Sequence, residues 1–97
     1  MEIFYNGQWG TVCDDGWDFA DANVVCTSLG FPGAIQAVSN AGFGAGTGPI
    51  LMDDVGCYGH EWSIFDCWHN GFGNHNCGHA EDAGVRCGIL SGILNSC

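Results

Sequence analysis

The chain has 97 residues and carries eleven Asp and Glu residues against a single basic residue, Arg86, which gives a formal net charge of −10. This length allows one domain, and a chain with almost no Lys or Arg cannot neutralise the phosphates of a nucleic acid. The same charge disfavours anionic membrane surfaces and favours divalent cations and basic partners. The sequence contains no run of about 18 apolar residues, which a transmembrane helix would need. We therefore expect no direct membrane insertion.

Seven cysteines and 17 glycines in so short a chain predict a loop-rich fold held together by disulfide bonds. Such bonds persist outside the cell, so we expect an extracellular or secreted protein, or the ectodomain of a membrane protein. Met1 leads directly into a strand-like segment with no signal-peptide pattern, so for an extracellular protein we expect this chain to be a fragment, an excised domain or an incomplete gene model. A reduced protein that binds zinc through Cys and His is the alternative.

The first predicted element is a hairpin, in which residues 2–5 and 8–13 flank Asn6-Gly7, a strong two-residue turn signal. An amphipathic helix is predicted for residues 19–29, because Asp18 can cap its first turn and Gly30 can end it.

Residues 35–39 have the pattern of a strand, and residues 42–48 form a glycine-rich loop. This loop resembles a phosphate-binding loop only superficially, because no Lys-Ser/Thr follows it, and we expect it to pack under aromatic side chains. A short second helix is predicted within residues 61–67. A closing strand is predicted for residues 85–87, after a long irregular loop rich in Gly, Asn and His.

Five segments in chain order, GQWGTVCDDGW, DANVVCTSLGFPGA, FGAGTGPILMDDVGC, HEWSIFDC and HNCGHAEDAGVRC, resemble a scavenger receptor cysteine-rich (SRCR) domain, in particular the repeated SRCR domains of salivary agglutinin-type glycoproteins. The resemblance predicts a single domain over residues 1–87, followed by an apolar tail or linker at 88–97. It implies an α+β fold, in which a curved antiparallel sheet cradles the main helix. The strand with which SRCR domains normally begin is missing, which we expect to leave a sheet edge exposed.

The resemblance also implies three disulfide bonds, although six cysteines by themselves allow many pairings. Group B members carry a further cysteine at the position of Phe31, so this chain has the six-cysteine pattern of group A. Cys97 has no family counterpart and is predicted to be unpaired. The implied pairs are Cys13–Cys77, Cys26–Cys87 and Cys57–Cys67.

Asp14 and Asp15 form the first candidate site. A bond between Cys13 and Cys77 would bring Glu81 close to them, and three carboxylates without a basic neighbour repel one another and raise at least one pKa. A Ca²⁺ or Mg²⁺ ion removes that conflict, because both ions prefer oxygen ligands. In SRCR domains the matching acidic positions form a Ca²⁺-dependent ligand-binding site. The alternative is a solvated turn.

A second candidate cation site consists of Asp53 and Asp54 with Asn76, and Glu61 offers a further oxygen. The alternative for this pair is an ordinary exposed strand end, where paired acids are also typical. The histidines near Cys67 and Cys77 do not have the usual zinc-finger spacing, so we expect them to be turn residues and hydrogen-bonding groups.

These patterns predict a non-enzymatic SRCR binding module, since no nucleophile motif is present. Its expected ligands are anionic glycans, microbial surface polymers and glycoproteins, bound through Ca²⁺, with avidity from tandem SRCR domains in the parent protein. The alternative is a metal-independent protein–protein interaction module, or a regulatory module of a larger receptor or protease.

Overall fold

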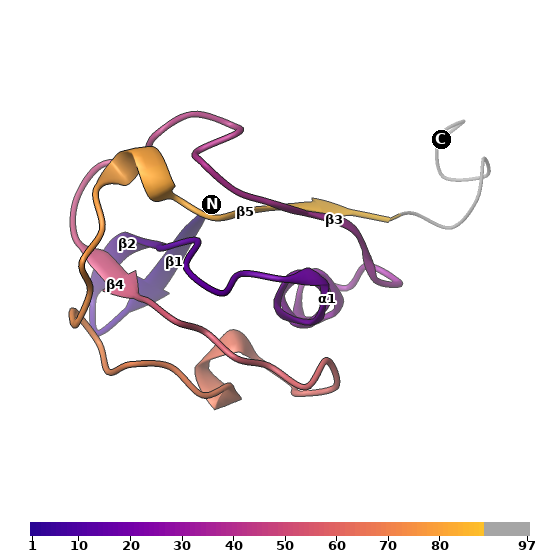
Figure 1. Ribbon diagram of the computed structural model, residues 1–97. Helices are drawn as coiled ribbons and strands as arrows, with labels where there is room; N and C mark the ends of the chain where they lie inside the picture. The colour runs from indigo at the N-terminus through magenta and orange to yellow at the C-terminus, as the bar shows by residue number, and fades with distance from the viewer. Residues whose placement is uncertain (89–97) are drawn as a thin grey trace.

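The computed structural model describes residues 1–88, so Cys97 and almost all of the predicted tail lie outside the described residues. Within this range the chain forms one α-helix, two short 3-10 helices and strands arranged in two small sheets (Figure 1). The elements are β1 (Glu2–Tyr5), β2 (Gln8–Val12), α1 (Phe19–Ser28), β3 (Ala34–Val38), β4 (Ile50–Met52), η1 (Ile64–Asp66), η2 (His79–Glu81) and β5 (Gly84–Cys87).

The predicted hairpin is confirmed: β1 and β2 pair in antiparallel fashion, and Tyr5 lies opposite Gln8. Asn6 (φ 54°) and Gly7 (φ 80°) both adopt the left-handed conformation that a tight two-residue hairpin turn requires. The predicted α+β class is confirmed as well. The strands form two sheets, β1-β2-β4 and β3-β5, and β1 is an edge strand.

One strand pair departs from the expected antiparallel arrangement. β4 pairs with β2 in parallel, with Thr11 opposite Ile50. Parallel neighbours need a long crossover connection, which α1 and β3 provide. Because the two strands run in the same direction, the residues that follow them emerge at the same edge of the sheet.

The helix α1 ends one residue earlier than predicted, at Ser28. Asp18 caps it as expected: the Asp18 carboxylate accepts from the Asp21 amide at 3.1 Å, and the Asp21 carboxylate accepts from the Asp18 amide at 2.9 Å. At the other end, the amides of Gly30 and Phe31 donate back to the carbonyls of Thr27 and Cys26. The predicted second helix is a single 3-10 turn, η1.

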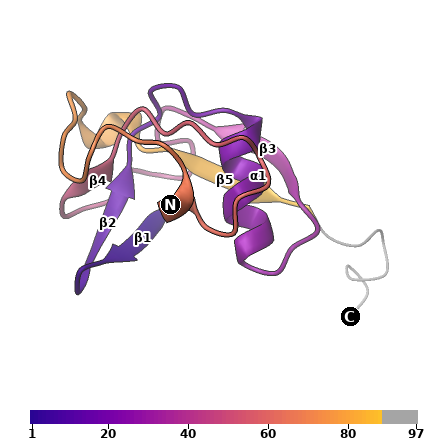
Figure 2. The ribbon, with the colours of Figure 1, turned by 90° about the horizontal axis from the view of Figure 1, so that it is seen from below.

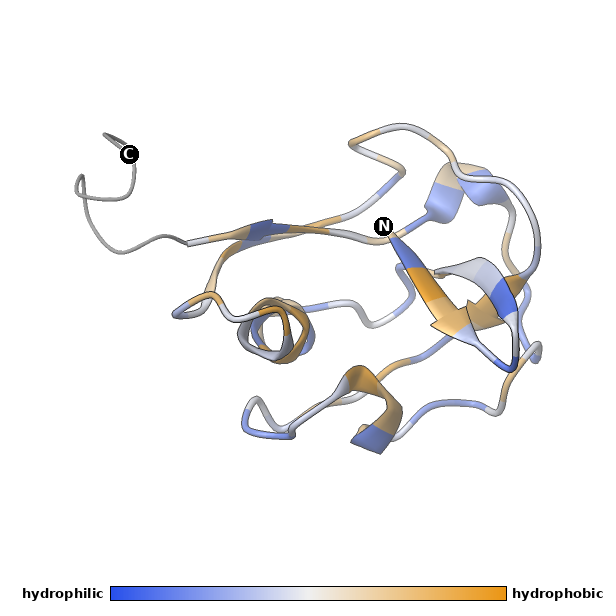
Figure 3. Cartoon of the chain, turned by 180° about the vertical axis from the view of Figure 1, so that it is seen from behind, coloured by the Kyte–Doolittle hydropathy of each residue, from blue (hydrophilic) through white to orange (hydrophobic). Residues whose placement is uncertain are grey.

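The helix α1 packs against β3 and β5, and Figures 1 and 2 show the three-stranded sheet at the other end. The core joins buried residues of α1 to those of the three-stranded sheet. Val12, Val24 and Met52 are fully buried. The Trp17 indole N–H donates to the Gly84 carbonyl at 2.9 Å, which joins the start of α1 to β5. Figure 3 shows apolar residues in β1 and β4, whereas η2 is mostly hydrophilic.

The three predicted disulfide bonds are confirmed. Cys13–Cys77 and Cys26–Cys87 connect positions 64 and 61 residues apart, and Cys57–Cys67 closes a short local loop. The two long-range bonds constrain most of the chain in the unfolded state. In the chain-entropy model, a loop as long as the one closed by Cys13–Cys77 stabilises the fold by about 4 kcal/mol.

Candidate functional site

The end of β2 is attached to η2 by covalent and hydrogen bonds. The Cys13–Cys77 disulfide is one connection. The Asp14 amide donates to the Glu81 carbonyl at 2.8 Å, and the Ala83 amide donates to the Val12 carbonyl at 2.7 Å. These bonds place the Asp14-Asp15 pair beside Glu81, although the two segments are far apart in the sequence.

Asp15 is the member of the predicted pair that faces Glu81. One carboxylate oxygen from each of these two residues, together with the sulfurs of Cys13 and Cys77, forms a group whose atoms all lie within 4.8 Å of one another. The sulfurs are joined in a disulfide, so the carboxylates are the ligands that this group offers to a cation. The Asp14 carboxylate lies outside the group and accepts a hydrogen bond from the Asn40 amide at 2.7 Å.

Asp15 also belongs to a second group, with Asp53 and Asp54, whose oxygens again lie within 4.8 Å of one another. The parallel pairing of β2 and β4 explains this proximity, because a pair of aspartates follows each strand at the same sheet edge. Asp53 is only 1% exposed and accepts from the Asp54 amide at 2.8 Å. We call Asp14, Asp15, Asp53, Asp54 and Glu81 the acidic cluster. The two candidate sites therefore adjoin through Asp15.

A polar cavity of about 410 Å³ adjoins the acidic cluster. Asn76 lines it with Asp53 and Asp54, and the Asn76 Oδ1 atom lies 3.6 Å from the Cys77 sulfur, which itself lies 3.5 Å from a carboxylate oxygen of Asp15. Sequence reasoning missed the other side chains of this wall. These side chains are Asn70, Asn74 and His75. The only sequence signal for them was the high Asn and His content of the loop that contains them.

The electrostatics of the cluster are unbalanced. Desolvation raises the pKa of Asp15, and repulsion from Asp53, Glu81, Asp54 and Asp14 raises it further. The only Lys or Arg of the chain does not neutralise the cluster, because it lies on β5 with its guanidinium carbon 5.8 Å from the centre of the Phe43 ring. Carboxylate oxygens at this spacing suit a hard divalent cation such as Ca²⁺ or Mg²⁺.

Glu61 is used differently from the expected extra oxygen of the second site. Its carboxylate accepts hydrogen bonds from the amides of Tyr58, Gly59 and His60, at 2.9, 2.9 and 3.1 Å. These hydrogen bonds, the one from Tyr58 above all, lower the pKa of Glu61 to about 2. Glu61 therefore organises the loop before η1, and it does not contribute to the acidic cluster.

The zinc alternative is wrong for Cys67 and Cys77, because both form disulfide bonds and have no thiolate to offer. The neighbouring histidines act as turn residues. The Nδ1 atom of His69 accepts from the Gly71 amide, and the Nδ1 atom of His75 accepts from the Cys77 amide, both at 3.1 Å.

His79 makes a connection that the sequence did not reveal. Its Nδ1 atom lies 3.0 Å from a carboxylate oxygen of Asp82, and its Nε2 atom lies 2.9 Å from the Gly48 carbonyl. The hydrogen bond with Asp82 and that with Gly48 raise the pKa of His79. For Asp82, burial raises the pKa, but the hydrogen bonds from Gly46 and His79 outweigh it and lower the pKa. Together these contacts fix the glycine-rich loop against η2.

Comparison with known proteins identifies related sequences. The chain is 61% identical over 87 residues to a scavenger receptor cysteine-rich domain superfamily protein of Patiria pectinifera, and 56% identical over 87 residues to the galectin-3-binding protein of Pongo abelii. Each match covers 90% of this chain but only 8% and 15% of the respective relatives. The chain thus corresponds to a small part of these proteins.

Solved structures give the same result. The dimeric form of the SRCR domain of mouse MARCO superposes with a TM-score of 0.84 at 50% identity, covering 91% of this chain and 83% of that one. The third SRCR domain of murine neurotrypsin superposes with a TM-score of 0.83 at 52% identity, covering 93% and 84%. The fold and the sequence are therefore shared along nearly the whole domain.

Within residues 1–88, no helix has the length and hydrophobicity needed to cross a membrane. The family model described as the scavenger receptor cysteine-rich domain matches residues 1–88. Domains of this family are extracellular ligand-binding modules without enzymatic activity. By its disulfide bonds, its fold and its sequence, the chain belongs to the scavenger receptor cysteine-rich domain family.

Proposed function

We propose that this domain binds anionic groups of glycans, microbial surface polymers or partner glycoproteins through Ca²⁺ held at the acidic cluster. The observation that carries the proposal is the position of Asp15. Its carboxylate lies within 4.8 Å of carboxylate oxygens from Glu81 and from the Asp53-Asp54 pair. A domain with a net charge of −10 repels anions by itself. A bound divalent cation reverses the charge locally and makes anion binding favourable.

Asp15 and Glu81 would hold the first ion, with Asp53 and Asp54 available to a second. Asp14 supports the site mainly through its backbone amide, which donates to the Glu81 carbonyl. Few protein oxygens surround either position, and Ca²⁺ takes six to eight. Coordination positions therefore remain open for carboxylate, sulfate or phosphate oxygens of a ligand. Mg²⁺ is the second candidate ion, since it also prefers oxygen ligands.

Calorimetric titration with CaCl₂ tests the metal requirement. We expect saturable heat for the native domain and a loss of affinity of tenfold or more for Asp15→Asn, which affects both carboxylate groups. Asp66→Asn is the matched control, because it removes the same charge from an exposed position on η1. Heat that is absent at millimolar Ca²⁺, or equal for the two variants, contradicts the proposal.

Ligand binding is tested separately with a sulfated glycan such as dextran sulfate, immobilised as a multivalent surface. We expect retention in Ca²⁺ and release by EDTA, with stronger retention for tandem copies because linked sites raise the effective concentration. Retention that persists in EDTA would indicate a mode of binding without metal. We also propose that the parent protein is secreted or displays this domain in an ectodomain.

The alternative function, a metal-independent protein interaction, rests on a different surface. Phe4 and Trp9 on the hairpin are 52% and 58% exposed, with ring centroids 5.1 Å apart. They border an apolar groove of about 250 Å³ that also includes Leu29 and Phe65. Partner binding through this groove would be lost in Trp9→Ala and unchanged by EDTA, which separates it from the Ca²⁺-dependent function.

A further inference from the structure

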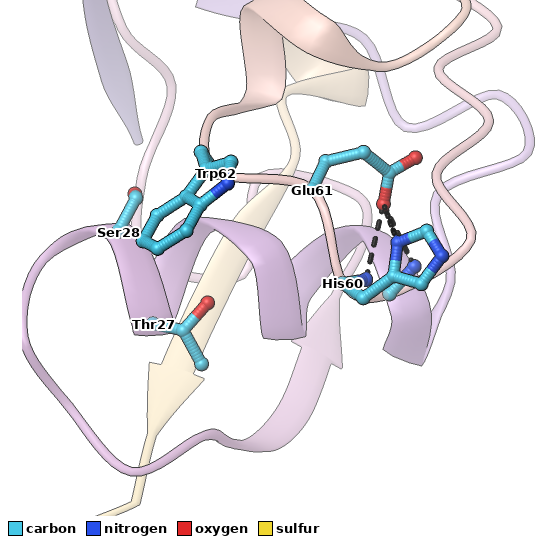
Figure 4. Close-up of a pocket in the computed structure, with 6 residues that line it drawn as sticks. Thr27, Ser28, His60, Glu61 and Trp62 are labelled. Atoms are coloured by element: carbon cyan, nitrogen blue, oxygen red, sulfur yellow. Dashed lines mark hydrogen bonds and ion pairs between the residues drawn. The ribbon is translucent and has the colours of Figure 1, made fainter.

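A second cavity, of about 480 Å³, lies between the last turn of α1 and the loop that precedes η1 (Figure 4). Its volume is typical of pockets that accept a small ligand or a single side chain. Trp62 forms one wall and is 91% exposed, so its indole contributes little to the core. No residue of the acidic cluster lines this cavity, and the other lining residues are Thr27, Ser28, Gly59, His60 and Glu61.

The helix side of the cavity presents hydrogen-bond acceptors. The Thr27 hydroxyl donates to the Asn23 carbonyl at 2.9 Å, and the Ser28 hydroxyl donates to the Val25 carbonyl at 2.7 Å. Each hydroxyl proton is thus used within the helix, and the oxygen offers lone pairs to the cavity. This is also the negative end of the helix dipole, and the last turn of α1 contains no basic residue.

The loop side carries a fixed negative charge. Glu61 remains ionised at neutral pH, because three backbone amides stabilise its carboxylate. The side-chain amide of Asn23 donates to the Gly59 carbonyl at 3.2 Å and holds this loop against α1. The geometry is therefore established before any ligand arrives, which reduces the entropic cost of binding.

We propose that this cavity binds a basic side chain, arginine or lysine, of a partner protein, with the cationic group over the face of Trp62. Tryptophan is the most favourable aromatic side chain for a cation–π contact. A guanidinium or ammonium group has several donors and no acceptor, which complements the lone pairs of Thr27 and Ser28. The net charge of −10 attracts basic partners to the domain. This contact does not depend on Ca²⁺.

The test is an NMR titration of the ¹⁵N-labelled domain with N-acetyl-arginine amide, using N-acetyl-citrulline amide as the neutral control of nearly the same shape. We expect saturable shifts of the Trp62 indole N–H and of the Thr27 and Ser28 amides with arginine, and an affinity for citrulline at least about fivefold lower. Trp62→Ala should weaken arginine binding by a similar factor. Trp68→Ala, which removes another exposed indole (65% exposed), should not.

Binding at the acidic cluster is distinguished by Asp15→Asn, which should leave the shifts around Trp62 unchanged. If arginine shifts signals only at the cluster, or binds Trp62→Ala as tightly as the native domain, the proposal is overturned. It is also overturned if citrulline or methyl α-glucoside shifts the Trp62 signals as strongly as arginine, because the cavity would then accept neutral ligands. Since Trp62 lies outside the core, its replacement should leave the fold intact.

Discussion

Asp15 and Glu61 are both carboxylates in loops beside a disulfide bond, yet their environments are opposite. Glu61 accepts hydrogen bonds from three backbone amides, which lower its pKa to about 2. Within residues 1–88, Asp15 accepts none from the backbone, and its pKa is raised by desolvation and then by neighbouring carboxylates, Asp53 first. The role of an acidic residue thus depends on what balances its charge. The amides balance Glu61, whereas the neighbours of Asp15 are other carboxylates, which oppose its ionisation.

The largest effect on stability and on Ca²⁺ binding should come from removing the disulfide next to Asp15. Cys13→Ser with Cys77→Ser should lower the free energy of unfolding by about 4 kcal/mol, because a long loop is released in the unfolded state. It should also abolish Ca²⁺ binding, since η2 and Glu81 are then less firmly attached to Asp15. Chemical denaturation and calorimetry measure the two effects.

The matched control removes the disulfide that closes the loop containing Glu61. Cys57→Ser with Cys67→Ser opens a loop whose ends are only 10 residues apart, so the expected loss is smaller, about 3 kcal/mol. Its Ca²⁺ affinity should equal that of the native domain. Equal losses of Ca²⁺ affinity in both double variants would mean that the two regions are not separate.

The next largest effect is expected at Glu61, whose contribution to stability should depend on pH. A carboxylate with a lowered pKa stabilises the fold above its unfolded pKa of 4.5, and this contribution is lost as the pH falls towards about 2. Glu61→Gln should therefore have a lower Tm at pH 7, and its difference from the native domain should shrink between pH 4.5 and 2. Thermal melts followed by circular dichroism measure it. A constant difference over this range would contradict the assigned pKa.

Asp15 should show the reverse behaviour. Because its pKa is raised above the usual 3.8, ionisation opposes folding as the pH rises past that value. In EDTA, Asp15→Asn should raise the Tm slightly at pH 7 and have no effect near pH 3. In saturating Ca²⁺, the native domain should instead be the more stable of the two, as expected when a ligand binds only the folded state. A variant that is less stable than the native domain in EDTA would refute the repulsion argument.

The smallest effect is expected at His79, which joins η2 to the glycine-rich loop. Its pKa is raised, so its contribution to stability is complete below about 6.5 and is lost as the pH rises through the folded-state value. His79→Gln should flatten the decline of the Tm between pH 6 and 9. The groups that face the ring are Asp82, Gly48 and the hydroxyl of Thr11. An unchanged slope would show that another group controls this titration.

Much of the fold could be predicted from the sequence because its signals are local. Asn6-Gly7 requires a tight turn, and the Asp18 cap fixes the start of α1 in the position where the structure has it. The disulfide pairs followed from the resemblance to SRCR domains, since spacing by itself does not determine them. The parallel pairing of β2 and β4 was missed, because strand direction depends on the path of the connecting chain.

That missed pairing explains what was incomplete in the candidate site. Asp15 and Glu81 could be placed together through the Cys13–Cys77 bond, but the proximity of Asp53 to Asp15 depends on the sheet. The turning of Asp14 towards the Asn40 amide depends on loop geometry that no local pattern encodes. Glu61 was expected to offer an oxygen to the second cation site, but it binds backbone amides instead. Almost every residue has a backbone amide, so the sequence gives no indication of such partners.

The two long-range disulfides also determine how the domain carries mechanical load. Tension applied through Met1 and Gly88 can pass from Cys13 directly to Cys77, and from there to Cys87. The chain between positions 27 and 76 lies outside this path, so it bears no tension while the covalent bonds remain intact. Asp53, Asp54 and Trp62 all belong to that shielded stretch. Glu81 lies on the loaded path between Cys77 and Cys87, so a force applied through the chain ends acts on the first candidate site while Asp53, Asp54 and Trp62 stay unloaded.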